Sequence, residues 1–220
     1  MKYGESAFDV LYLLFAVSSG ILMLCKAKKK DGKLMGVSAL VLGLGDAFHL
    51  VPRVLNYFVD ADFTKALGIG KLITSVTMTV FYVLLYFVWL LHFKKGRDQS
   101  TLSTIFILAI SRIVLCLFPQ NGWLTNESDV TWGIIRNVPF VILGALVCLC
   151  YYQTRSKDHD LRLVFLYILL SFLFYIPVAV GAPLLPALGM LMLPKTVCYV
   201  LMIISFLHAS LGNRGTKSGT

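Results

Sequence analysis

Three ionisable side chains lie at helical spacing within one apolar stretch of the sequence. Asp46, His49 and Arg53 are separated by three and four residues, so an α-helix places them on one stripe of its surface. Imidazole titrates nearest neutrality, and a neighbouring carboxylate tunes it, so this pair could exchange protons with a substrate. We predict Asp46 and His49 as catalytic residues. The alternative is that His49 only forms hydrogen bonds within the core.

Four cations lie within the apolar segments, each at a similar depth toward the outer end of its segment. They are Arg53, Lys71, Arg136 and Lys195. An ionisable side chain in a bilayer costs about 2.5–3.5 kcal/mol on insertion scales, so each of them needs a partner or a function. Together they predict a basic, outward-opening pocket for a phosphate or carboxylate group. The alternative is that each side chain reaches separately to lipid headgroups.

A fifth cation, Arg112, falls near the middle of its own apolar segment. Asp46 is the carboxylate at the same depth, so we predict an Asp46–Arg112 ion pair and include Arg112 among the ligand-binding residues. The alternative is a salt bridge that only fixes the register of two helices. Gly43 and Gly45 precede Asp46, and their lack of a side chain lets another helix approach closely beside the carboxylate.

The composition indicates which elements position these residues. Of the 220 residues, 58% are hydrophobic and 14% charged, and the mean hydropathy is +0.80, too apolar for a soluble domain. A bilayer core about 30 Å thick needs about 20 apolar residues per helix. The sequence predicts an all-α, polytopic transmembrane bundle of about seven helices in a single domain, residues 1–220. The expected spans are 7–25, 34–58, 66–92, 101–118, 132–152, 161–181 and 186–210.

The net charge of +9 is explained by topology, and we expect no nucleic-acid partner. Lys and Arg gather in the connections 26–33, 94–97 and 155–162 and in the tail, which seven alternating helices place on one side. The other side carries Glu5, Asp9, Asp60, Asp62, Glu127 and Asp129. The positive-inside rule therefore predicts an external N-terminus and a cytosolic C-terminus in a multi-pass protein of the plasma membrane.

No metal or other cofactor is expected. His92 and His208 fall about 15 Å or more from His49 by helical rise, too far to complete one metal shell. The five cysteines lie in apolar segments without metal-ligand spacing. A lysine in a seventh helix could form a retinal Schiff base. However, span 161–181 has no tryptophan, and Lys195 lacks the Asp-x-x-x-Lys spacing of microbial rhodopsins.

The run Leu-Gly-Asp-Ala-Phe-His-Leu-Val-Pro-Arg at 44–53 resembles the Leu-Gly-Asp-Ala segment, followed by proline, of the YhhN-like lysoplasmalogenase family. Residues 63–86 loosely resemble the glycine-containing helix that follows there, and Val-Ile-Leu-Gly-Ala-Leu at 141–146 is similar to the family's second signature helix. The resemblance implies a multi-pass hydrolase that cleaves the vinyl-ether bond of lysoplasmalogens, with Asp46 at the position of a family aspartate.

The chain departs from that family's pattern at three points. It reads Cys-Leu-Cys-Tyr at 148–151, where an aspartate follows the second signature in the family. It has no histidine near Thr74 and Ser75, and seven helices are predicted where the family is expected to have eight.

The predicted function is binding of an anionic, lipid-like ligand in the outer half of the bundle, with membrane lipids as partners and no oligomeric state assigned. Lysines and arginines hold the phosphate as charge-assisted donors. In an enzyme, Asp46 and His49 would deliver protons and activate water. The alternative is a transporter or receptor without enzymatic activity, in which the Asp46–Arg112 pair breaks and reforms as the bundle opens.

Overall fold

The computed structural model describes residues 2–96, 98–125, 129–181 and 185–212. Within those ranges, seven helices are long and apolar enough to cross a membrane. They are α1 (Lys2–Lys26), α2 (Lys30–Phe58), α3 (Thr64–His92), α4 (Gln99–Leu117), α5 (Val130–Gln153), α6 (Val164–Gly181) and α7 (Met192–Leu211). Two short 3₁₀ helices, η1 (Pro119–Asn121) and η2 (Pro186–Leu191), precede α5 and α7.

The predicted all-α bundle of seven transmembrane helices is confirmed. The largest difference concerns the last span, expected at 186–210. Its first six residues form η2, and the α-helix begins at Met192. A proline has no backbone N–H and fixes φ, and Pro186 opens η2, so the chain enters α7 through this tighter turn. The side of the membrane on which each end lies stays a prediction.

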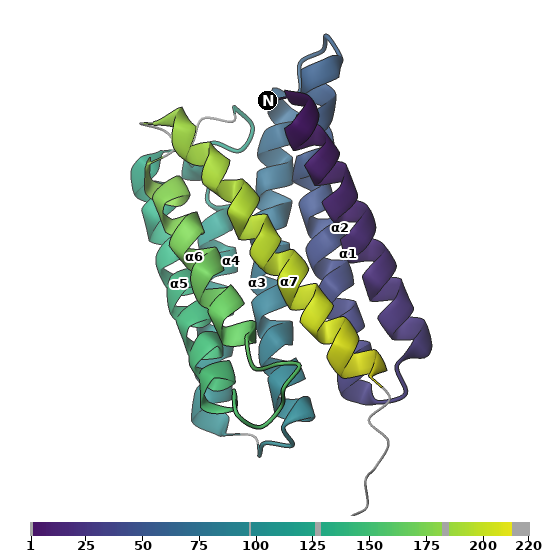
Figure 1. Ribbon diagram of the computed structural model, residues 1–220. Coiled ribbons are helices and arrows are strands. Elements are labelled where there is room, and N and C mark those ends of the chain that lie inside the picture. The colour runs from purple at the N-terminus through teal and green to yellow at the C-terminus, as the bar shows by residue number, and fades with distance from the viewer. Residues whose placement is uncertain (1, 97, 126–128, 182–184, 213–220) are drawn as a thin grey trace, which may run out of the picture.

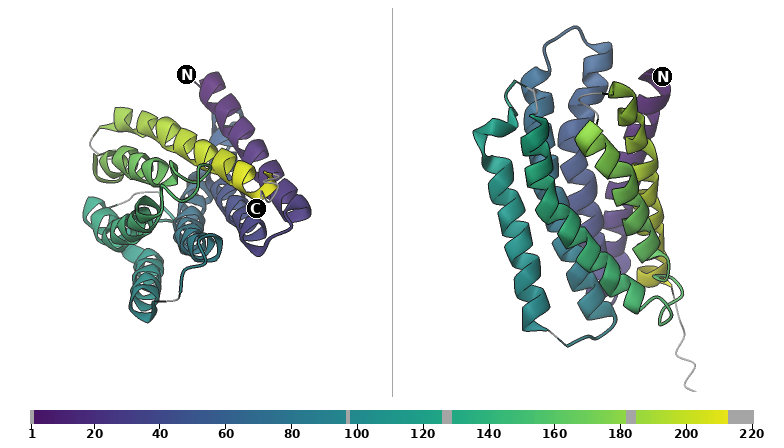
Figure 2. Two further views of the ribbon diagram at one scale, coloured as in Figure 1. Left: turned by 60° about the horizontal axis from the view of Figure 1, so that its bottom comes forward. Right: turned by 90° about the vertical axis from the view of Figure 1, so that its left-hand side faces the viewer.

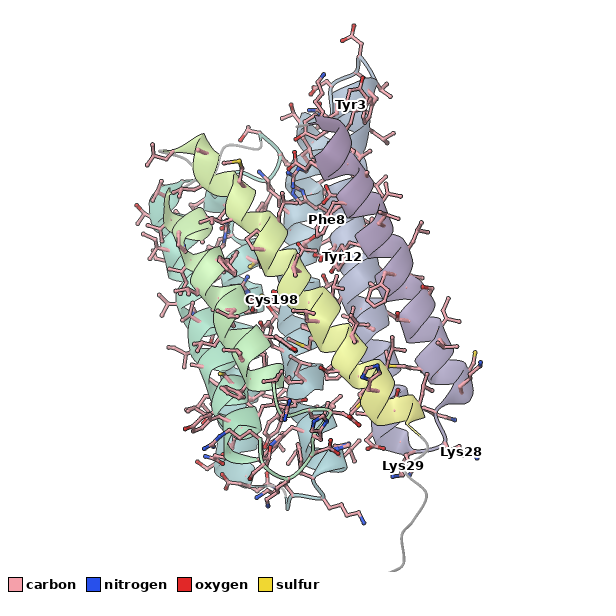
Figure 3. The ribbon with its side chains drawn as sticks, in the orientation of Figure 1. Tyr3, Phe8, Tyr12, Lys28, Lys29 and Cys198 are labelled. Carbon is pink, nitrogen blue, oxygen red and sulfur yellow. The ribbon has the colours of Figure 1, made fainter. Side chains whose placement is uncertain are left out.

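The chain crosses from one end of the bundle to the other seven times (Figure 1). We call the end where α1 begins the N-terminal end, and α7 finishes at the opposite end. The connections α1–α2, α3–α4 and α5–α6 lie at the opposite end (Figure 1), as Lys28 and Lys29 do in Figure 3. Within the described residues, these connections carry the basic residues that the sequence assigned to one side; Arg97 and the basic tail lie outside the described residues.

Helix α7 crosses the bundle diagonally between its two halves (Figures 1 and 2). It contacts α1 and α2 on one side and α6 on the other, whereas α4 lies at the edge against α3 and α5. Residues of α7 therefore reach side chains of both halves. This placement lets Lys195 line both of the cavities described below.

Glycines in α2 and α3 bring those two helices, and α1, into close contact. A Cβ on Gly45 would lie 2.1 Å from Thr77 Oγ1 of α3, and one on Gly43 would lie 2.9 Å from the Ala16 Cβ of α1. The prediction that these two glycines admit neighbouring helices is confirmed. On α3, a Cβ on Gly70 would lie 2.2 Å from the Phe48 carbonyl oxygen. Asp46 and His49 are thus held between α1 and α3.

At the end of the bundle opposite the N-terminal end, one histidine contacts two carboxylates. His92, the last residue of α3, lies 2.9 Å through Nδ1 from Asp31 of α2 and 3.1 Å through Nε2 from Asp158 of the α5–α6 connection. Nearby, Trp89 Nε1 donates to Thr154 Oγ1 at 3.0 Å. Side-chain contacts therefore tie three separate parts of the chain together at this end.

Candidate functional site

A cavity of about 820 Å³ lies toward the N-terminal end of the bundle, and all helices from α2 to α7 contribute side chains to it. Four of the described lining residues are cations from four helices: Lys71 (α3), Arg112 (α4), Arg136 (α5) and Lys195 (α7). Asp129 is the one carboxylate among the described residues that line this cavity. The structure therefore brings together four of the five residues predicted to bind a ligand.

Arg112 is the most deeply buried of these cations, with a residue exposure of 2%. Its Nη1 donates to Asn137 Oδ1 at 2.7 Å and to the Arg136 carbonyl oxygen at 3.2 Å. The guanidinium carbon lies 3.7 Å from the ring centroid of Phe140, a cation–π distance. All of these partners are neutral groups, so they position Arg112 without cancelling its charge.

The predicted Asp46–Arg112 ion pair is wrong. Asp46 Oδ2 accepts a hydrogen bond from Tyr12 of α1 at 2.7 Å, and the described part of the chain contains no ion pair between Asp46 and Arg112. Arg112 turns instead toward Asn137 on α5, the helix that packs beside α4. Similar depth in the membrane does not determine which neighbour each side chain faces.

Arg136 lies where η1 meets the cavity. Its Nη1 donates to Asn121 Oδ1 at 2.7 Å, and its guanidinium carbon lies 4.4 Å from the Trp123 ring centroid. Asn121 in turn donates through Nδ2 to the Leu115 and Phe118 carbonyl oxygens, both at 2.8 Å. Asn121, anchored to carbonyl oxygens at the C-terminal end of α4, thus holds Arg136 in place.

Lys195 and Arg53 occupy different settings. Lys195 Nζ lies 4.7 Å from the Tyr175 ring centroid and 5.5 Å from that of Tyr199. Arg53 does not line the large cavity, because it forms an ion pair with Glu5 of α1. Sequence reasoning missed this partner for Arg53.

A second, smaller cavity of about 80 Å³ adjoins the first. Asp9, Asp46, Arg53 and Tyr199 line the small cavity only, whereas other side chains face both cavities: His49, Thr74, Met192 and Lys195. Tyr12, which bonds Asp46, lies midway along α1 in Figure 3. Asp9 and Asp46 therefore share the small cavity with Arg53 and Lys195, and neither carboxylate lines the large cavity.

Asp9 groups by sequence with the acidic residues on one side of the membrane, and the structure places its side chain inside the bundle. It lies within α1, is 4% exposed, and its Oδ2 accepts no hydrogen bond from the described residues. The sequence does contain a signal for this. Ser6, Asp9 and Tyr12 recur every three residues, the spacing of one helical face, and all three are buried.

The two predicted catalytic residues both line the small cavity, and only His49 also lines the large one. His49 Nδ1 is buried and lacks a hydrogen-bond partner in the described structure, which contains no hydrogen bond between His49 and Asp46. Their catalytic roles stay predictions. Over the described ranges, no three His, Cys, Asp or Glu side chains are arranged to hold a metal ion.

The arrangement is suited to binding an anion next to a buried acidic pair. The resemblance of residues 44–53 to YhhN-like lysoplasmalogenases stays a prediction, since no comparison with known proteins tests it. No family model matches the sequence, and neither a curated protein nor a solved structure matches the chain.

Proposed function

We propose that the protein binds an anionic amphiphile, a lipid-like molecule with a phosphate or carboxylate group, in the large cavity. One observation carries this proposal: Lys71, Arg112, Arg136 and Lys195, from four different helices, line one cavity in which Asp129 is the single described carboxylate. Like charges held together away from water repel each other, and a bound anion would offset that repulsion.

Two of the cations are already positioned before a ligand arrives. Arg112 is held by Asn137 and Phe140, and Arg136 is held by Asn121 and Trp123. Guanidinium groups bind phosphate and carboxylate oxygens through paired, charge-assisted hydrogen bonds. Little side-chain entropy is then lost when the anion binds, which favours affinity.

The rest of the lining favours an amphiphile over a small inorganic ion. Met78, Phe140, Val178 and Met192 provide apolar walls beside the cations. The volume of about 820 Å³ is within the range of small-molecule sites, about 300–1,000 Å³, and far exceeds what a phosphate group alone would fill. An acyl or alkenyl chain could occupy the remaining space.

Equilibrium binding to the full chain in neutral phosphatidylcholine nanodiscs tests this proposal. The probes are oleoyl lysophosphatidylglycerol and monooleoylglycerol, which share a chain but differ in charge, with glycerol phosphate as a competitor without a chain. We expect only the charged lipid to bind tightly. Strong competition by glycerol phosphate would instead assign the site to free phosphates.

Charge-removing variants locate the site. Because one charge-assisted hydrogen bond is worth about 1.5–3 kcal/mol, Arg136→Gln and Lys195→Met should each weaken binding by about 10-fold to 150-fold. The matched control is Lys157→Met, an exposed lysine in the α5–α6 connection at the opposite end. Unchanged affinity in both cavity variants, or equal binding of monooleoylglycerol, would overturn the proposal.

A second candidate function is hydrolysis of a vinyl-ether lysophospholipid. The observation that favours it is the position of His49, whose unpartnered Nδ1 belongs to a side chain facing both cavities. In this candidate, His49 and Asp46 supply the proton and activate the water. Aldehyde release from a lysoplasmalogen, lost in His49→Gln and Asp46→Asn, would support it. No aldehyde, with lysophosphatidylglycerol binding intact, would leave the binding function alone.

A further inference from the structure

The small cavity contains two buried carboxylates, Asp9 on α1 and Asp46 on α2. We propose that Asp9 and Asp46 form a proton-binding site. The site holds one proton when the large cavity is empty and takes up a further proton when an anion binds in that cavity. This inference rests on the proposed function, which it extends from anion binding to proton-coupled anion binding.

The first support is the orphaned oxygen of Asp9. Its Oδ2 is buried, accepts no hydrogen bond within the described structure, and belongs to a side chain lining the cavity. Burial of an ionised carboxylate without donors is very costly, and such a group neutralises instead. A proton from solvent that forms an O–H bond at this oxygen removes the charge of Asp9 within the cavity.

The second support is the setting of Asp46. Tyr12, itself 3% exposed, donates its O–H to Asp46 Oδ2 at 2.7 Å, which stabilises Asp46 as the charged member of the pair. Asp9 and Asp46 are near enough to interact electrostatically. Two carboxylates sharing a site of low polarity do not both ionise readily.

Lys195 connects this pair to the large cavity. It lines both cavities and interacts electrostatically with Asp46. With one proton on the pair, the remaining negative charge balances Lys195. An anion in the large cavity interacts with the same ammonium group of Lys195. The negative charge of Asp46 is then less compensated, so the pair gains affinity for a proton. By linkage, anion binding tightens as the pH falls.

Other charged or titratable groups lie near Asp9 and Asp46, and each is an alternative site for the proton unless its setting excludes it. Arg53 lines the cavity but is already paired with Glu5. Helix α3 contributes Thr74, which does not titrate, to the cavity lining. The remaining titratable groups facing the site are Tyr12 on α1, His49 on α2 and Tyr199 on α7. Phenols stay protonated near neutrality, so His49 is the competing proton site.

Proton uptake is measured with a pH indicator in weakly buffered nanodisc suspensions during lysophosphatidylglycerol binding. This phosphodiester keeps one charge near neutrality, so it contributes no proton itself. We expect uptake in the wild type, and an affinity that increases by up to about tenfold for each unit of pH decrease. Asp46→Asn should abolish the uptake, because Asp46 is the charged member of the pair and receives the further proton, whereas Asp60→Asn, an exposed acid in the α2–α3 connection, and His49→Gln should retain it.

Infrared spectroscopy of the ligand-free protein tests the resident proton separately. We expect a protonated-carboxyl C=O band at neutral pH that is present in the wild type and in Asp60→Asn but lost in Asp9→Asn. Absence of the band from the wild type, or uptake that depends on His49 and not on Asp46, would overturn the inference. If no anion binds at any pH, the proposed function fails, and the infrared band still decides whether the pair holds a proton.

Discussion

Arg112 of α4 and Asn137 of α5 are joined by a 2.7 Å hydrogen bond from the guanidinium Nη1 to the side-chain oxygen Oδ1. The same oxygen accepts from the Tyr175 hydroxyl of α6 at 2.8 Å, and Asn137 Nδ2 donates to the Gly133 carbonyl oxygen. One neutral amide on α5 thus aligns a cation from α4 and a phenol from α6. A buried guanidinium is oriented while its positive charge remains available.

Arg112→Met separates a structural role from a binding role. Replacing a buried ion by an apolar side chain of similar volume is often neutral or stabilising. We expect the variant to fold with a melting temperature equal to or above that of the wild type, and to lose lysophosphatidylglycerol affinity by at least about tenfold. Circular dichroism melts and binding isotherms check this. A large drop in melting temperature with unchanged affinity would make Arg112 a purely structural residue.

Asn137→Asp tests the charge with little change in shape. A carboxylate at this position would pair with Arg112 and cancel its charge toward a ligand. We expect the affinity for lysophosphatidylglycerol to fall, with monooleoylglycerol binding unaffected. The control is Tyr175→Phe, which removes the other hydrogen bond to Asn137 and adds no charge. If both variants weaken binding equally, lost geometry rather than charge is responsible.

Gly70→Ala should destabilise the protein through the α2–α3 contact. The added Cβ would lie 2.2 Å from the Phe48 carbonyl oxygen, and backbone cannot move aside as a side chain can. Overpacking of this kind costs about 1–3 kcal/mol. The matched control is Gly4→Ala in α1, where a Cβ meets nothing within 4 Å. Thermal melting in nanodiscs should show a lower transition for Gly70→Ala alone.

Acid should weaken the start of α4 through its cap. Asp98 accepts hydrogen bonds from the Thr101 side chain and from the Thr101 and Ser100 backbone N–H groups, and these hold the pKa of Asp98 below its ordinary value. A lowered pKa means that the cap's contribution is full above the ordinary aspartate pKa of about 3.9 and disappears as the pH falls through the folded-state value.

Hydrogen-exchange protection factors at Ser100 and Thr101 measure the effect of this cap. They should decrease on acidification below about pH 4 in the wild type. Asp98→Asn keeps a capping side chain that does not titrate, so its protection should not follow pH. An equal loss of protection in Asp98→Asn would exclude the carboxylate as the cause.

The helices could be predicted from the sequence because length and hydropathy are local properties. The span expected at 34–58 is found as Lys30–Phe58, and that at 66–92 as Thr64–His92. The first helix begins at Lys2, five residues before its predicted start, because the charged Lys2 and Glu5 lie ahead of the apolar run. Charged residues at a helix end mask that end in a hydropathy pattern.

The side-chain partners within the site were only partly predictable. The gathering of Lys71, Arg136 and Lys195 near one depth followed from counting residues along each helix. The partners Asn137 for Arg112, Tyr12 for Asp46 and Glu5 for Arg53 did not. They depend on which helices are neighbours and how each is rotated, and both properties arise from packing between distant parts of the chain.

The His92 bridge makes the two ends of the bundle unequal. At that end Asp31 and Asp158 hold α2, α3 and the α5–α6 connection together, whereas the space beside Lys195 lies toward the other end. The His92 contacts therefore fasten the end of the bundle that lies away from the cavity, and helices that move around the cavity remain tied together at that far end.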